Sequence, residues 1–173
     1  MATFDTLIEG CKKQRQKAML EIYNLCCEPV FNACLRIVAN EQDAEEIMQD
    51  AFLKAFDNVK NFTGNQKSFI SFVKTIAINR CIDYYRRHQK DPFFTDVDNE
   101  ADTLPDEDVE EVYPIETIQK KINELPDGYR MVLSLHLLDD MDFSDIAVTM
   151  NVQPSTIRSQ YVRAKEKLRQ LLV

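Results

Sequence analysis

The sequence predicts an all-helical protein made of two small domains, residues 1–90 and 115–173, joined by an acidic linker at 91–114. Only 3 of the 173 residues are Gly, whereas average usage of about 7% would give roughly 12. Sheets with tight hairpins need more glycine than this. Apolar residues recur at the i, i+3, i+4, i+7 spacing of amphipathic helices in both predicted domains. Charge is also segregated along the chain, which separates the domains from the linker.

The linker region is more negative than the chain as a whole, whose net charge is −8. Between Asp91 and Glu116 lie 11 of the 29 acidic residues and no Lys or Arg, so the remaining residues carry a net charge of +3. The segment also contains three prolines and few aliphatic residues, so it cannot bury enough apolar surface to fold alone. Two interpretations stay open: a solvated spacer, or a mimic of nucleic acid that lies in a basic channel of a partner.

The first domain is predicted to contain three helices, and its first 14 or so residues give no prediction. Residues 14–39 have a helical stripe, although Pro29 is expected to kink or interrupt it. Asn40 has the chemistry of an N-cap, with Asp43 placed as in a capping box. The next stripe is the most regular in the chain: Ala44, Ile47, Met48, Ala51, Phe52, Ala55, Phe56 and Val59.

Residues 67–89 form the third predicted helix, and its later turns are basic and aromatic. Tyr84, Tyr85 and His88 alternate with arginines, among the cations Lys67, Lys74, Arg80, Arg86, Arg87 and Lys90. Basic groups follow phosphates, and aromatic rings stack on unpaired bases. The alternative is a helix end whose cations favour the C-terminal dipole and whose tyrosines cover the core.

The second domain begins with two predicted helices, 115–125 and 128–138, and ends with a helix-turn-helix spacing. Residues 143–150 form a short striped helix, Asn151 occupies a turn position that favours a left-handed residue, and Pro154 opens the last helix. Inward positions of the last helix are predicted to be Ile157, Tyr161, Ala164, Leu168 and Leu171. In this motif the second helix enters the major groove of duplex DNA, where Arg can read guanine. A plain helical hairpin with a solvated basic face is the alternative.

Several classes of site are not expected. The five cysteines form no CxxC pair, and two of them are adjacent, so reduced core cysteines are favoured over disulfides or a zinc site. No nucleophile–base set or Gly-rich phosphate loop is found, so we predict neither an enzyme nor a cofactor or metal. No signal-peptide pattern and no apolar run of about 18 residues occurs, so membrane insertion is not expected.

Three segments, in this order, resemble the sigma factors of bacterial RNA polymerase, in the extracytoplasmic-function (ECF) group of the sigma-70 family. DAEEIMQDAFLKAFDNVKNF at 43–62 is similar to the helix of conserved region 2, and 68–90 to its promoter-melting segment. Residues 124–172 are similar to region 4. The resemblance implies a cytoplasmic protein with a region 2-like domain at 1–90 and a region 4-like helix-turn-helix domain at 115–173. It also favours the nucleic-acid mimic as the interpretation of the linker.

The resemblance further implies partners and site residues. Core RNA polymerase is expected to bind through the clamp helices of its largest subunit and its flap region; the implied clamp contacts are Asp43, Glu46, Gln49 and Asp50. Contacts to the −10 promoter element are implied for Lys74, Asn79, Arg80, Tyr84 and Arg87. Asn79 stands where the family reads a flipped-out base of the non-template strand. Contacts to the −35 element are implied for Ser155, Thr156, Arg158, Ser159 and Arg163. An anti-sigma factor is a further expected partner.

The chain departs from the family pattern in the last helix-turn-helix. Asn151 stands where Gly is usual, and Gln160 and Val162 replace residues that are often basic or His, which reduces the expected phosphate contacts.

The resemblance as a whole gives the hypothesis of an ECF sigma factor that recognises −10 and −35 elements and assists promoter melting. The alternatives are a stand-alone helix-turn-helix regulator of duplex DNA and a protein-interaction adaptor of the same helical build. A duplex-only regulator would not need the aromatic patch around Tyr84.

Overall fold

The computed structural model describes residues 2–88 and 112–173, which fall into two compact units, Met1–His88 and Gln89–Val173. Every regular element in the described residues is a helix, so the predicted all-helical, two-domain architecture is confirmed. Residues 91–111 of the predicted linker lie outside the described part of the chain.

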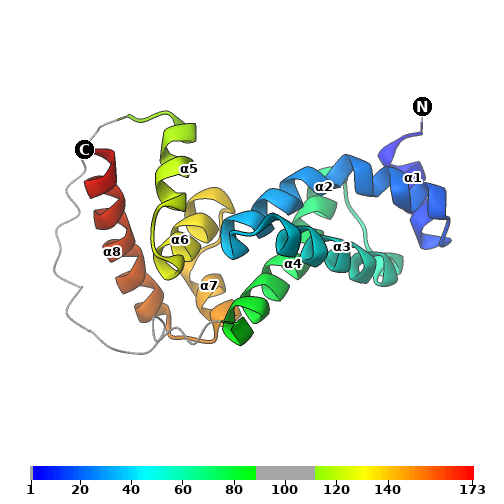
Figure 1. Ribbon diagram of the computed structural model, residues 1–173. Coiled ribbons are helices and arrows are strands. Elements are labelled where there is room, and N and C mark those ends of the chain that lie inside the picture. Colours follow the sequence, from blue (N-terminus) through cyan, green and yellow to red (C-terminus); the bar gives the residue numbers. More distant parts are fainter. Residues whose placement is uncertain (1, 89–111) are drawn as a thin grey trace. The chain divides into compact units, whose positions relative to one another are not determined.

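The first unit packs three long helices side by side: α2 (Gln16–Val38), α3 (Glu41–Asp57) and α4 (Gln66–His88) (Figure 1). The predicted cap at Asn40 is present, since its Oδ1 accepts the backbone N–H of Asp43 at 3.0 Å. A single 3-10 turn, η1 (Val59–Asn61), follows α3. The stripe predicted for α3 is buried along its whole length.

Pro29 was expected to kink or interrupt α2, and the interruption does not occur, since the helix is continuous from Gln16 to Val38. Proline cannot donate to the carbonyl of Leu25, one turn earlier. Leu25 is 50% exposed, so water can reach this side of the helix and hydrogen-bond that carbonyl.

An additional helix, α1 (Phe4–Lys12), occupies the stretch for which the sequence gave no prediction. It packs against α2 and η1 and buries Leu7, Ile8 and Cys11. The approach to α2 requires a glycine, because a Cβ built on Gly10 would lie 2.6 Å from the Cβ of Ala18. The phenyl ring of Phe4 also reaches Phe69 on α4, with ring centroids 6.2 Å apart.

Phe69 is the centre of an aromatic core that joins α1, α3, α4 and the segment between α3 and α4. Its centroid lies 5.2 Å from that of Phe62, 6.1 Å from Phe72 and 6.3 Å from Phe56. Four of the five cysteines are also buried in this unit, and all five are free thiols. These rings and thiols come from all four α-helices of the unit, so each of them contributes to its buried interior.

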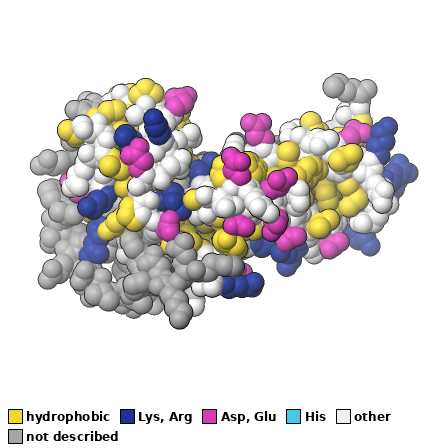
Figure 2. Space-filling view, viewed as in Figure 1, with side chains coloured by type: hydrophobic (Ala, Val, Ile, Leu, Met, Phe, Trp, Pro, Cys, Tyr) yellow, Lys and Arg dark blue, Asp and Glu magenta, His cyan; other side chains and the backbone are white. Residues whose placement is uncertain are grey.

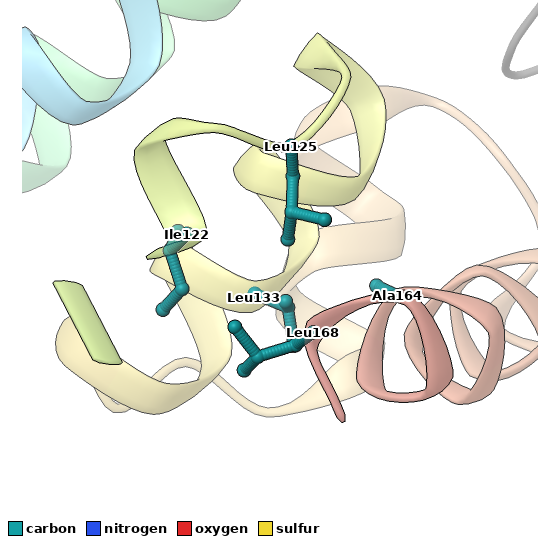
Figure 3. Close-up of a cluster of buried hydrophobic side chains, with 5 residues drawn as sticks. All are labelled: Ile122, Leu125, Leu133, Ala164 and Leu168. Atoms are coloured by element: carbon teal, nitrogen blue, oxygen red, sulfur yellow. The ribbon is translucent and has the colours of Figure 1, made fainter. Parts of the chain in front are cut away.

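The second unit contains α5 (Ile115–Asn123), α6 (Asp127–Leu133), the π-helix η4 (Ser134–Leu138), α7 (Phe143–Met150) and α8 (Pro154–Leu172). Helix α8 packs on α5, α6 and α7. Figure 3 shows side chains from α5, α6, α8 and the α5–α6 connection meeting in its core: Ile122, Leu125, Leu133, Ala164 and Leu168. Leu171 was predicted to face inward but is 36% exposed, and Leu172 packs on the core instead.

Candidate nucleic-acid interfaces

The C-terminal half of α4 presents one basic and aromatic face. Arg80, Tyr84 and Arg87 are spaced i, i+4, i+7 and therefore share a side of the helix. Lys74 and Asn79 lie on α4 but, at about 100° per residue, they point to either side of that face. Asn79 is exposed, and its Nδ2 donates to the carbonyl of Thr75 at 3.0 Å. Lys90 and the side chain of His88 lie outside the described residues.

The two adjacent tyrosines have different environments. Tyr85 is only 5% exposed and belongs to the core, so it cannot take part in the predicted stacking patch. Tyr84 is half-buried at the surface, and its hydroxyl donates to Oδ2 of Asp43 on α3 at 2.6 Å. This hydrogen bond, burial and the charges of Asp43 and Glu46 raise the pKa of Tyr84. The phenol therefore stays protonated and remains a donor at neutral pH.

Helix α3 presents the acidic face, and Figure 2 shows acidic side chains gathered over this helix. Glu46, Gln49 and Asp50 are exposed, whereas Asp43 is half-buried. Leu53, which sequence reasoning passed over, is 63% exposed on the same helix. Its position, i+3 from Asp50 and i+7 from Glu46, places an apolar side chain beside the carboxylates. Asp50 also lies 3.8 Å from Nη1 of Arg80, which links the acidic face to the basic one.

Helices α7 and α8 form the predicted helix-turn-helix. Asp142 caps α7 by accepting the backbone N–H of Asp145 at 2.8 Å. Asn151 ends α7 in the left-handed conformation, with φ 56° and ψ 47°, as its residue type predicted. The turn is closed by the N–H of Val152, which donates to the carbonyl of Ala147 at 3.0 Å. Pro154 is the first residue of α8.

The residues predicted to face DNA occupy one side of α8. Ser155 and Arg158 are exposed. Thr156, Ser159 and Arg163 are half-buried along the same side. Gln160 is only 7% exposed and faces the core, so its departure from the family pattern does not remove a phosphate contact. Val162 is half-buried, and its substitution still bears on this surface.

An aromatic cluster that sequence reasoning missed connects α8 to the rest of its unit. The ring of His136 in η4 stacks on Phe143 of α7 at 4.4 Å and meets Tyr161 of α8 edge-on at 4.8 Å. Nδ1 of His136 lies 2.8 Å from the carbonyl oxygen of Met141, and because a carbonyl only accepts, Nδ1 carries the proton. The cluster holds α8 at its second turn. No local sequence pattern predicts this aromatic cluster, because its members come from three separate elements.

The comparisons with known proteins agree with this geometry. The family model "Sigma-70 region 2" matches residues 23–91, and "Sigma-70, region 4" matches residues 115–168. The ECF RNA polymerase sigma factor SigW of Bacillus subtilis (strain 168) is 31% identical, over 95% of this chain and 94% of the relative. The chain belongs to the ECF sigma factors. Sigma factors are transcription initiation factors, so the family match favours this function over a stand-alone regulator.

Further relatives of this sigma factor share its length and fold. The ECF RNA polymerase sigma-E factor of Escherichia coli (strain K12) is 25% identical, over 96% of this chain and 92% of the relative. The structure of CnrH in complex with the cytosolic domain of CnrY has a TM-score of 0.53 at 18% identity, covering 96% and 94% of the two chains. The sigma factor RpoE from Bartonella quintana, solved with the anti-sigma factor NepR, has a TM-score of 0.50 at 17% identity, covering 90% and 97%.

No helix within residues 2–88 and 112–173 is long and apolar enough to cross a membrane. In the same residues, no group of three or more His, Cys, Asp or Glu side chains is placed to hold a metal ion.

Proposed function

We propose that this sigma factor joins core RNA polymerase and directs initiation at specific promoters, with residues 1–90 acting on the −10 element and 115–173 on the −35 element. The observation that carries the proposal is the match of both units to sigma-70 regions, in the order expected for the family. Each unit also has a basic helix face suited to nucleic acid, on α4 and on α8.

The polymerase surface is proposed to be the exposed part of α3, formed by Glu46, Gln49, Asp50 and Leu53. Carboxylates around an exposed leucine suit a partner that is basic at its rim and apolar at its centre. In this family the partner is the pair of clamp helices in the largest subunit. The flap region is the proposed partner of the second unit.

The −10 surface is proposed to comprise Lys74, Asn79, Arg80, Tyr84 and Arg87. The arginines would follow phosphates, and the half-exposed ring of Tyr84 would stack on an unpaired base. Asn79, which is exposed and lies beside this face, is proposed to contact the base that leaves the helical stack.

The −35 surface is proposed to be the N-terminal half of α8, with Ser155, Thr156, Arg158, Ser159 and Arg163. In helix-turn-helix proteins this part of the second helix contacts base edges in the major groove. The acidic linker is proposed to act as a nucleic-acid mimic inside the polymerase. An anti-sigma factor is a further proposed partner, because the related RpoE is solved with one.

The test is run-off transcription with purified core polymerase on genomic fragments. We expect defined start sites that depend on this sigma factor, and co-purification of the chain with core. The Asn79→Ala variant is expected to slow promoter opening, measured by permanganate footprinting, more than it weakens binding to core. Absence of both initiation and core binding would contradict the proposed function.

A further inference from the structure

The hydrogen bond between Tyr84 and Asp43 joins two residues that the family resemblance assigns to different partners. We propose that Asp43 is a positioning residue of the promoter-opening surface, which acts by fixing the phenol of Tyr84, and that it is not a contact to polymerase. The inference rests on the proposed role of Tyr84 at the −10 element. It divides the acidic residues of α3 into two groups with separate tasks.

The geometry at Asp43 favours an internal role. Its backbone N–H is held by the Oδ1 of Asn40 at 3.0 Å, so the carboxylate extends from a capped and fixed first turn. Its Oδ2 accepts the hydroxyl of Tyr84 at 2.6 Å, across 41 residues of sequence. That distance is typical of a hydrogen bond from a hydroxyl to an ionised carboxylate, which is stronger than a neutral one. Asp43 is also half-buried, unlike Glu46, Gln49 and Asp50.

The bond has a direct consequence for the ring of Tyr84. A tyrosine side chain has two rotatable bonds, and tying its hydroxyl to a fixed acceptor limits both of them. A ring that is oriented in advance loses less conformational entropy when a base stacks on it. Because Tyr85 is buried, Tyr84 is the member of this tyrosine pair that can offer such a surface.

The ion pair between Asp50 of α3 and Arg80 of α4 is different in kind. Asp50 and Arg80 approach only to 3.8 Å, and their side chains are 62% and 39% exposed. An exposed ion pair of this length is weak and easily exchanged, so Asp50 remains available to a basic partner. At Asp43, by contrast, a polymerase contact would share a half-buried carboxylate whose Oδ2 already accepts the Tyr84 hydroxyl at 2.6 Å.

The experiment uses the full chain and core polymerase, with Tyr84→Phe, Asp43→Ala and the double variant Asp43→Ala/Tyr84→Phe. Three quantities are measured: the Kd for core, the rate of promoter opening by permanganate reactivity, and the thermal unfolding midpoint. Each single variant is expected to slow opening roughly threefold to tenfold, the range of one lost hydrogen bond. The double variant should be no slower than the slower single variant, because both changes remove the same bond. Affinity for core should stay within about twofold.

Matched variants separate the alternatives. Asp43→Asn keeps an oxygen acceptor and should restore part of the opening rate lost in Asp43→Ala, even if the alanine variant unfolds more easily. Asp50→Asn makes the same change of charge and should instead weaken binding to core. A loss of core affinity in Asp43→Ala, with Tyr84→Phe like the wild type, would overturn the inference, as would effects that multiply in the double variant.

The role of Tyr84 itself is tested by Tyr84→Ala. Normal opening in this variant would show that the proposed −10 function of Tyr84 is wrong. Slow opening in Tyr84→Ala together with normal opening in Tyr84→Phe would refute the positioning role of Asp43 and leave the proposed function intact.

Discussion

Adjacent residues of this sigma factor differ in what they can bind, because a helix turns by about 100° with each residue. Tyr84 offers a half-exposed ring, while Tyr85 is buried in the core of the first unit. Ser159 lies on the proposed DNA side of α8, while Gln160 faces the core. At the residue scale, function is therefore decided by the direction of each side chain as well as by its chemistry.

Replacement of Arg158 is expected to relax sequence preference at one upstream base pair. Arg158 is exposed near the start of α8, where a guanidinium can reach guanine, and such a contact contributes about 1–3 kcal/mol. Competition binding of the Arg158→Ala holoenzyme to promoters changed one base pair at a time measures this preference. Lys167→Ala, further along the same helix, is the control. An equal loss on every sequence would instead identify Arg158 as a phosphate contact.

The buried thiols predict an alkaline loss of stability. Burial, followed by the neighbouring Cys27 and Cys11, raises the pKa of Cys26 from 9.0 to about 11. Between these values the unfolded chain has lost its thiol proton and the folded chain has kept it. The stabilisation is therefore fully present below pH 9 and is lost as the pH rises toward 11.

Urea unfolding of the wild type and Cys26→Ala, from pH 8 to 11, measures this effect. The alanine variant has no thiol to ionise, so the stability advantage of the wild type should fall by up to about 3 kcal/mol over this range. Lysines and surface tyrosines titrate in both proteins and cancel. A pH-independent difference would contradict the prediction.

At the scale of single elements, α1 depends on its packing. It has only 9 residues, and isolated helices shorter than about 12–15 residues are marginal in water. Its stability therefore comes from burying Leu7, Ile8 and Cys11 against the first unit.

Gly10→Ala is expected to destabilise the first unit by about 1–3 kcal/mol, although alanine is the better helix former. The added Cβ would lie 2.6 Å from that of Ala18, and neither atom can rotate away. Chemical denaturation monitored by circular dichroism gives the change. The variant Gly10→Ala/Ala18→Gly removes the clash and should recover stability beyond the sum of the single changes. A stabilised Gly10→Ala would show that α1 does not pack as described.

At the scale of the whole molecule, each unit has its own core. Phe69 and the buried cysteines lie in the first unit, and Ile122, Leu133 and Leu168 lie in the second. Charge is also divided by segment, since the net −8 combines a strongly acidic stretch with a balance of +3 elsewhere. A nucleic-acid partner is thus compatible with an acidic chain.

Fragments 1–90 and 112–173 are each expected to be helical and to unfold cooperatively, because each contains a complete core. Circular dichroism and thermal unfolding of the two fragments and of the full chain test this. The second fragment should be the less stable one, since smaller domains bury a smaller fraction of their surface. A disordered 112–173 fragment would show that this unit depends on the rest of the chain.

Local patterns allowed most of the helices to be predicted. The predicted stripe of α3 and the Asn40 cap agree with the structure, because they depend on residues three or four positions apart. The left-handed Asn151 and the helix start at Pro154 also agree, because they depend on the residue type itself. Helix α1 was missed although the local signal is present: Phe4, Leu7, Ile8 and Cys11 have the i, i+3, i+4, i+7 spacing, and Thr3 caps the helix. Of the kink or interruption expected at Pro29, the interruption does not occur, because the helix continues with one hydrogen bond fewer beside the exposed Leu25.

The sequence alone determined the helical class, the helix-turn-helix and the resemblance to sigma factors, since periodicity, capping and motif order are properties of neighbouring residues. Only the tertiary structure decided that Tyr84 meets Asp43, that His136 meets Tyr161, and that Tyr85 and Gln160 are buried. These outcomes depend on how helices cross and which side chains interdigitate. A pattern within one helix defines an apolar face, but not the partner on which that face packs.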